Sequence, residues 1–339
     1  MSLSPRIRKT GNSSGFDSSP IAGRDLIPPE IVVYLTGSCP HADCGHCIIK
    51  DEFSDSYLAL ADLESLFSQM NSLGIPFVSF TGGEPFDYEC GLENAVSLAK
   101  RKGLFVNQII TNASFAVSVS AAASRLNGLK DAGFAAVELP RGLLIPSLTI
   151  SSDREHQKTI PIQNVQNLVD AARAVFGKNV DLTVNYVLFS ERKEDVLGAN
   201  PWLSEVNVTF GNVCYEGRAE KLAEKRLSLA SEKLAEWDSP CSWESKAWPS
   251  VPAIFPDGRI NFCCYFGLKS PLSLGNLRNT ALICALRGIN KNPALVALFK
   301  HGPVKLAMVT GNVPGDFKTY GKCGFCNKVM EGAEKDVLR

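Results

Sequence analysis

The amino-acid sequence predicts an α/β fold built around a parallel sheet. Strand-like runs rich in β-branched and aromatic residues recur up to residue 210, helical patterns fill the gaps between them, and glycines follow two of these helical patterns. A strand and helix alternation repeated this often implies a parallel sheet with helices outside. The sheet is then either an open, doubly wound sheet or part of a (β/α) barrel.

The elements can be placed in order. One helix has its apolar residues on a single face from Leu63 to Leu73 and ends at Gly74, and another extends from Val165 to Val175 and ends before Gly177. The irregular residues 135–146 are interpreted as an insertion before the fourth strand. Six runs are predicted as strands: 31–36, 77–81, 105–111, 148–151, 180–188 and 206–210.

The composition is that of an ordinary soluble enzyme. Among 339 residues, 35 basic and 35 acidic side chains balance, so no net charge attracts nucleic acid or an anionic membrane. No run reaches the roughly 18 apolar residues that a membrane span needs, and the N-terminus has no apolar core for export. We therefore expect a cytoplasmic protein without nucleic-acid or membrane partners. In that reducing compartment, 11 cysteines are better explained as metal ligands or reactive thiols than as disulfides.

The chemically unusual residues follow the ends of the predicted strands. Carboxyl ends of parallel strands meet at one edge of a sheet or barrel, so these residues are expected to converge on one rim. In strand order they are Cys39, Cys44 and Cys47, then the run TGGEP at 81–85, then Thr111 and Asn112, then Ser151, and finally Cys214 after the sixth strand.

The three cysteines after the first strand indicate a metal centre with one position open. A structural zinc ion takes four ligands, and an iron-sulfur cube normally takes four thiolates. His41 and His46 could complete a zinc site. The run TGGEP favours a different ligand beside the metal, because its two glycines let the backbone approach closely and Glu84 offers a carboxylate to an ammonium group.

The motif C-x4-C-x2-C, followed by TGGEP after the next strand, resembles the signature of the radical S-adenosylmethionine (radical SAM) superfamily. The spacing between Cys39 and Cys44 is one residue longer than the corresponding spacing in the usual motif, C-x3-C-x2-C. The resemblance implies a partial (β/α)6 TIM-like barrel in which Cys39, Cys44 and Cys47 hold a [4Fe-4S] cluster. It also implies that S-adenosylmethionine binds to the open iron, with its amino group received by Gly82, Gly83 and Glu84. Further positions around its methionine and ribose would be Thr111, Asn112, Ser151 and Asn185.

This resemblance also implies a reaction. Electrons from a flavodoxin or ferredoxin would reduce the cluster, and cleavage of S-adenosylmethionine would give a 5'-deoxyadenosyl radical that abstracts a hydrogen atom from the substrate. The protein would supply a water-poor cavity and hold one C–H bond of the substrate against the radical carbon.

A second group of cysteines lies in the C-terminal third. Residues 250–264 read as two strands joined at Asp257-Gly258, a strong hairpin signal, with Cys263 and Cys264 at the far end. With the final KCGFC they resemble the twitch or SPASM extensions of radical SAM enzymes, which form small α+β iron-sulfur domains. The resemblance implies a second, auxiliary [4Fe-4S] cluster, although Cys264 could replace Cys263 and the C-x2-C pair could instead bind zinc. Its ligands would be Cys241, Cys263, Cys323 and Cys326.

The resulting domain plan has five parts. An N-terminal arm, flexible or folded over the barrel mouth, spans 1–27, and the barrel spans 28–219. A linker helix follows at 220–240, the auxiliary domain at 241–330 and a tail at 331–339.

Three functions are consistent with this plan. The first is a radical SAM enzyme that oxidises or cross-links a peptide or small natural product with help from the auxiliary cluster. The second is an epimerase in which the thiol of Cys214 or Cys264 returns a hydrogen atom. The third is a zinc or iron-sulfur protein without catalysis, which would not need an ammonium-binding loop beside its metal. His156 follows the fourth strand and either positions a ligand or is a satisfied polar residue.

Overall fold

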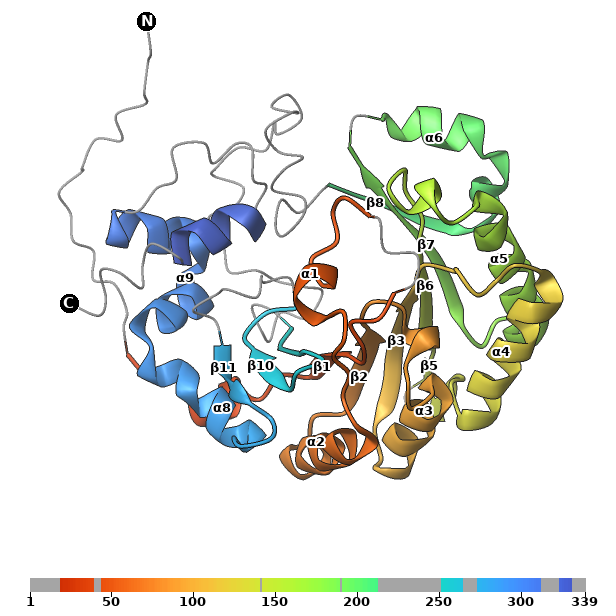
Figure 1. Ribbon diagram of the computed structural model, residues 1–339. Helices are drawn as coiled ribbons and strands as arrows, with labels where there is room; N and C mark the ends of the chain where they lie inside the picture. The colour runs from red at the N-terminus through yellow and green to blue at the C-terminus, as the bar shows by residue number, and fades with distance from the viewer. Residues whose placement is uncertain are drawn as a thin grey trace, which may run out of the picture.

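A computed structural model describes residues 19–39, 44–140, 142–189, 191–212, 251–264, 273–311 and 323–330. Its centre is a curved sheet with helices along its outer side, and the C-terminal segments continue from one edge of that sheet (Figure 1). The predictions for residues 1–18, for the linker helix at 220–240 and for the tail at 331–339 lie outside the described residues.

The parallel sheet confirms the predicted α/β class. Its six strands run side by side in the order β1-β2-β3-β6-β7-β8, and every neighbouring pair is parallel. Each strand lies within two residues of a predicted run. Their bounds are β1 Glu30–Tyr34, β2 Phe77–Thr81, β3 Phe105–Thr111, β6 Ser147–Ser151, β7 Asp181–Leu188 and β8 Asn207–Asn212.

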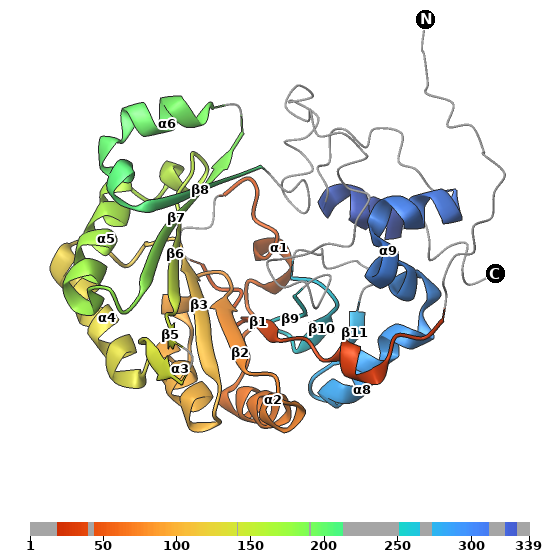
Figure 2. The ribbon, with the colours of Figure 1, turned by 180° about the vertical axis from the view of Figure 1, so that it is seen from behind.

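Amphipathic helices connect these strands and cover the outer face of the sheet (Figures 1 and 2). The helix α2 (Leu60–Leu73) buries Leu63, Leu66 and Phe67 completely and ends at Gly74, which adopts the left-handed conformation with φ of 72°. The other bounds are α1 Lys50–Phe53, α3 Leu92–Arg101, α4 Val119–Ala132, α5 Ile162–Phe176 and α6 Lys193–Ala199, with short 3-10 turns η2 Pro85–Asp87, η3 His156–Lys158 and η4 Pro201–Glu205.

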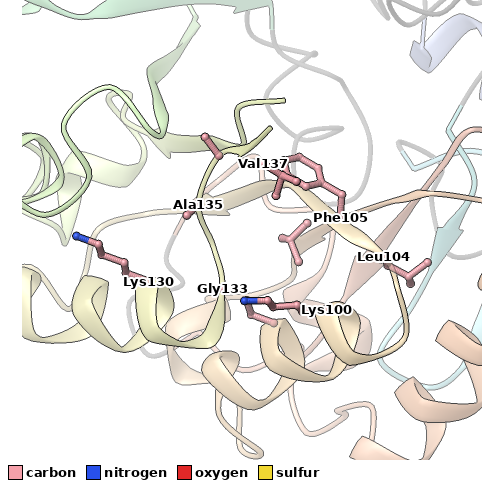
Figure 3. Close-up of a pocket in the computed structure, with 10 residues that line it drawn as sticks. Lys100, Leu104, Phe105, Lys130, Gly133, Ala135 and Val137 are labelled. Atoms are coloured by element: carbon pink, nitrogen blue, oxygen red, sulfur yellow. The ribbon is translucent and has the colours of Figure 1, made fainter. Parts of the chain in front are cut away.

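The insertion before the fourth barrel strand is regular. It forms an antiparallel hairpin of β4 (Val137–Leu139) and β5 (Gly142–Leu144). Strands of three residues are too short for a hydrophobic period to be recognised, which explains why the sequence suggested an irregular segment. A cavity of about 180 Å³ lies beside the hairpin and is lined by Lys100, Phe105, Lys130 and Val137 among others (Figure 3). It lies near the amino end of β3, opposite the rim where the cysteines were predicted.

The C-terminal segments extend the barrel sheet. The hairpin predicted at Asp257-Gly258 is present: β9 (Ala253–Ile254) pairs antiparallel with β10 (Arg259–Asn261), and β10 pairs with β11 (Ser273–Asn276). In addition, β9 pairs in parallel with β1, so the sheet has the order β11-β10-β9-β1 at this edge.

Helices pack behind this extension (Figure 2). They are α8 (Leu282–Gly288), the 3-10 turn η7 (Ile289–Lys291), α9 (Pro293–Thr310), which is kinked at Gly302, and a helix at 323–330. In the described part of the chain, no single helix is long and apolar enough to cross a membrane. The two helices Leu282–Lys291 and Pro293–Met308, which are bent against each other, reach that length and composition only when they are taken together.

The described part of the N-terminal arm packs against these C-terminal helices. The backbone N–H of Ile21 donates to the side-chain oxygen of Asn290 at 2.8 Å, and the Asn290 amide donates back to the Ile21 carbonyl at 2.9 Å. The turn η1 (Gly23–Leu26) follows, and Leu26 is buried. Residues 19–27 therefore connect the C-terminal helices to β1.

Candidate active site

The cysteine loop runs from the carboxyl end of β1 to α1. Its entry is fixed by Gly37, whose N–H donates to the carbonyl of Ser56 at 2.8 Å. A Cβ at Gly37 would lie 1.6 Å from the carbonyl oxygen of Phe53, so only glycine fits where the two ends of the loop meet. Cys44 is buried, whereas Cys39 and Cys47 are partly exposed.

The TGGEP loop after β2 packs directly on this entry segment. The N–H of Gly83 donates to the Thr36 carbonyl at 2.7 Å, and the N–H of Glu84 donates to the Ser38 carbonyl at 2.8 Å. A Cβ at Gly83 would lie 2.0 Å from the Ser38 oxygen, and one at Gly82 would lie 2.5 Å from the Thr36 oxygen. Close packing of two backbones is therefore one physical reason for both glycines.

Glu84 joins the loops after β2 and β3. Its carboxylate is fully buried and accepts hydrogen bonds from the N–H of Phe86 at 3.1 Å, the hydroxyl of Thr111 at 2.7 Å and the N–H of Asn112 at 2.8 Å. Burial raises the pKa of this carboxyl to about 7, and the three hydrogen bonds offset only part of that effect. Glu84 is thus a carboxylate held by the chain itself at the rim.

Asn112 extends this network to the cysteines. Its side-chain amide donates to the sulfur of Cys39 at 3.4 Å, and its side-chain oxygen accepts from the N–H of Ser114 at 2.9 Å. The family resemblance implies that Asn112 lies near the methionine or ribose of S-adenosylmethionine, and this role stays a prediction. The structure places it against a predicted metal ligand.

The loop after β6 also contacts the cysteine loop. Ser151 and Asn185 are paired in the register of β6 and β7, and the N–H of Ser152 donates to the Asn185 carbonyl at 2.9 Å. Glu155, which is 2% exposed, then accepts a hydrogen bond from the N–H of Gly45 at 3.1 Å. No role for Glu155 could be predicted, because an acidic residue in a charged loop has no local sequence pattern that reveals its burial.

Next to this contact, the partly buried His46 and His156 lie beside the buried Asp153 and form a polar trio with it. Nδ1 of His156 lies 2.8 Å from Oδ2 of Asp153, and Nε2 of His46 lies 3.6 Å from the same oxygen. The rings of His46 and His156 meet edge to face with centroids 5.0 Å apart, and Nδ1 of His46 is buried without a hydrogen-bond partner.

The charges of the trio follow from its contacts. Burial lowers the pKa of His46. Burial opposes the charged forms of Asp153 and His156 as well, but their mutual hydrogen bond and opposite charges outweigh it: the pKa of Asp153 is lowered, and the pKa of His156, to which Cys44 contributes in the same direction, is raised to about 10.

Residues 33–199 match the family described as the radical SAM superfamily. These residues form a radical SAM domain. A comparison with curated proteins returned no match.

Solved radical SAM enzymes share the fold. The structure of SuiB from Streptococcus suis, bound to precursor peptide SuiA, aligns with a TM-score of 0.55 at 14% identity over 90% of this chain and 76% of SuiB. Native anSMEcpe with bound AdoMet aligns with a TM-score of 0.54 at 12% identity over 90% of this chain and 95% of that one. A second anSMEcpe structure, with AdoMet and the Kp18Cys peptide, aligns with a TM-score of 0.50 at 14% identity over 76% of this chain and 79% of that one.

The arrangement of donors fits the radical SAM cluster. The His46, Asp153 and His156 trio is the one group of three metal-binding side chains in the described part of the chain whose ligand atoms all lie within 4.8 Å of one another. The sulfurs of Cys39, Cys44 and Cys47 therefore do not all lie within 4.8 Å of one another, whereas around a single zinc ion Zn–S bonds of about 2.3 Å put the sulfurs about 3.8 Å apart. Three separated thiols suit a larger, multi-iron group.

The C-terminal cysteines of this radical SAM chain divide between two apolar clusters. Cys263 and Cys326, both buried, belong to the main core. Cys264 belongs to a smaller cluster with Tyr34, Phe53 and Phe255, and the Tyr34 hydroxyl donates to the Cys264 carbonyl at 2.6 Å. Cys323 is partly exposed at the start of the last helix. Cys214 and Cys241 lie outside the described residues, so their predicted roles stay predictions.

Proposed function

We propose that this radical SAM protein binds a [4Fe-4S] cluster through Cys39, Cys44 and Cys47 and uses S-adenosylmethionine to oxidise or cross-link a peptide. The observation that carries the proposal is that three loops meet at the carboxyl ends of β1, β2 and β3. These are the cysteine loop, the TGGEP loop and the Thr111-Asn112 turn, and hydrogen bonds of Glu84 join them. The rim of a parallel barrel is where such folds carry chemistry.

The chain's own residues have distinct tasks in this proposal. Asn112 and the loop after β6 hold the cysteine loop at two points, through contacts to Cys39 and Gly45. The buried side chain of Glu84 is the proposed partner of the ammonium group of S-adenosylmethionine, whose positive charge would favour the ionised carboxylate. When bound, the cluster and S-adenosylmethionine supply a one-electron reduction and a carbon radical that abstracts hydrogen from the substrate.

We further propose an auxiliary [4Fe-4S] cluster held by Cys241, Cys263, Cys323 and Cys326. The placement of Cys263 and Cys326 in one core, with Cys264 in another, supports Cys263 as the ligand. A cluster with four thiolates has no open iron, so its task would be to accept an electron from the substrate radical and not to bind substrate.

A peptide is our proposed substrate class because two structures that share this fold, SuiB and anSMEcpe, hold peptides. A small natural product remains the alternative within the same chemistry. A flavodoxin or ferredoxin is the proposed electron donor, and the cytoplasm is the proposed compartment.

Anaerobic reconstitution with iron and sulfide tests the proposal. The protein should become brown, bind about eight irons if both cubes form, and cleave S-adenosylmethionine when reduced. Replacing Cys39, Cys44 and Cys47 by alanine should abolish cleavage and leave about four irons. Colourless protein that contains zinc and cleaves nothing would refute the function, and cleavage by the triple variant would refute the assignment of these ligands.

A further inference from the structure

The sulfur of Cys39 lies against the side-chain amide of a buried residue. Nδ2 of Asn112 donates to Sγ of Cys39 at 3.4 Å, and Asn112 is 7% exposed. The other end of the amide fixes its orientation, because its oxygen Oδ1 accepts the backbone N–H of Ser114 at 2.9 Å. Only the oxygen of an amide can accept such a bond, so the group that faces Cys39 is the NH2. An amide does not ionise, and this donor is therefore present at any pH.

The turn that carries Asn112 is held from two directions. Ala113 is completely buried and has a φ of 65°, in the left-handed region, which a residue with a side chain keeps only where its surroundings impose it. Two asparagines of α5 supply part of these surroundings. The side-chain amide of Asn164 donates to the Ser114 carbonyl at 3.1 Å, and that of Asn167 donates to the Ala116 carbonyl at 3.0 Å.

The backbone beside Cys39 is held as well. The N–H of Ser38 donates to the Thr36 hydroxyl at 2.9 Å, and the Ser38 carbonyl accepts the N–H of Glu84 at 2.8 Å. The Glu84 carboxylate in turn accepts the backbone N–H of Asn112 at 2.8 Å. The donor and the acceptor of the contact between Asn112 and Cys39 are thus positioned independently of that contact.

The chemistry of such a contact is defined once the cysteine binds iron. A cysteine that binds iron does so as a thiolate, which accepts hydrogen bonds. A hydrogen bond to a ligand sulfur stabilises the more electron-rich, reduced state of an iron-sulfur cluster, and therefore raises its reduction potential.

We propose that Asn112 donates a hydrogen bond to the thiolate of Cys39 and thereby raises the reduction potential of the cluster held by Cys39, Cys44 and Cys47. This inference rests on the proposed function, because it requires iron at these cysteines. Asn112 is a tuning residue here, since it touches a cluster ligand and not the reacting atoms. The resemblance implies a contact of Asn112 with S-adenosylmethionine, so the test is made without that cofactor.

Pulsed electron paramagnetic resonance tests the contact itself. The protein is produced with asparagine whose side-chain amide carries the heavy isotope of nitrogen, reconstituted anaerobically with iron and sulfide, and reduced. The catalytic signal is the one lost when Cys39, Cys44 and Cys47 are replaced by alanine. We expect this signal to show a coupling to the labelled nitrogen that disappears in Asn112→Leu.

Asn164→Leu is the matched control for this variant. It makes the same substitution and removes a hydrogen bond to the same turn, but it leaves Asn112 unchanged and the turn still bound to Asn167. We expect Asn164→Leu to keep the coupling to the labelled nitrogen.

A redox titration of the same signal tests the effect on the cluster. We expect the midpoint potential to become more negative in Asn112→Leu and to stay unchanged in Asn164→Leu. Asn112→Ser is titrated in parallel, because Asn112→Leu could lose the cluster. The serine hydroxyl can still accept the N–H of Ser114 but is too short to replace the contact to Cys39, so a negative shift is expected here as well.

Three results would overturn the proposal. The first is a wild-type signal without coupling to the labelled nitrogen, or with a coupling that persists in Asn112→Leu. The second is an unchanged potential in the cluster-containing Asn112 variants. The third is an equal shift in Asn164→Leu, which would assign the effect to the turn as a whole. A wild-type protein that takes up no iron refutes the proposed function itself, which distinguishes the two failures.

Discussion

The N–H of Asn112 donates to the buried carboxylate of Glu84 at 2.8 Å, so the loop after β3 is tied to the loop after β2 through an ionisable group. Because burial raises the pKa of this carboxyl from 4.5 to about 7, the folded chain binds the proton more tightly than the unfolded chain. The stabilising contribution of Glu84 is complete below pH 4.5 and is lost as the pH rises through 7.

This linkage predicts a pH-dependent effect of Glu84→Gln, which cannot ionise. Between pH 5 and 8 the free energy of unfolding of the wild type should fall relative to that of Glu84→Gln, by on the order of 3 kcal/mol, since each pKa unit corresponds to about 1.4 kcal/mol. Urea denaturation of the cluster-free protein at a series of pH values measures the difference. A difference that stays constant over this range would show that the Glu84 pKa is ordinary.

The close contact of the TGGEP loop with the cysteine loop predicts a strong effect of Gly83→Ala. The added Cβ would lie 2.0 Å from the Ser38 carbonyl oxygen, so the cysteine loop must move, at a cost of about 1–3 kcal/mol or more. We expect a lower free energy of unfolding and reduced iron uptake at the catalytic site. Gly198→Ala in α6, where a Cβ would meet nothing within 4 Å, is the control and should be neutral or slightly stabilising. Equal iron uptake by both variants would contradict the prediction.

The strand order of the barrel could be predicted from the sequence because each strand has a local signal and consecutive parallel strands are neighbours. The pairing of β9 with β1 could not, since it joins Val32 to Ala253 across more than two hundred residues of chain and each partner offers only a short apolar run. The same limit applies to the site. Cysteine spacing and TGGEP are local motifs, whereas the burial of Glu155 and its contact with Gly45 depend on tertiary packing alone.

Aromatic stacking joins the C-terminal segment to the helix after the cysteine loop. Phe255 is fully buried and stacks on Tyr34 at 4.8 Å and on Phe53 of α1 at 5.3 Å between ring centroids. Phe255→Ala should therefore lower the free energy of unfolding by about 3–5 kcal/mol and weaken iron binding by the cysteine loop.

Tyr34→Phe provides the comparison for this variant. It removes only the hydroxyl that donates to the Cys264 carbonyl, and should cost about 1 kcal/mol while leaving the stack intact. Thermal or urea unfolding and iron content measure both effects. A Phe255→Ala protein that is no less stable than Tyr34→Phe would mean that the stack does not couple the two segments.

The fate of the substrate radical separates oxidation from epimerisation. A thiol that returns a hydrogen atom needs no electron acceptor, whereas oxidation does, and the proposed auxiliary cluster offers one. Two cysteines are candidate donors: Cys214 follows the last barrel strand, and Cys264 lies in the aromatic cluster with Tyr34 and Phe255. Because the proposed auxiliary cluster would favour oxidation, we expect turnover of a peptide substrate in deuterated water to give a product that has lost two electrons and carries no solvent deuterium at the reacting carbon. Mass spectrometry and nuclear magnetic resonance of the product measure both properties. Solvent deuterium at that carbon, lost in Cys214→Ala or Cys264→Ala, would instead establish an epimerase and identify its donor.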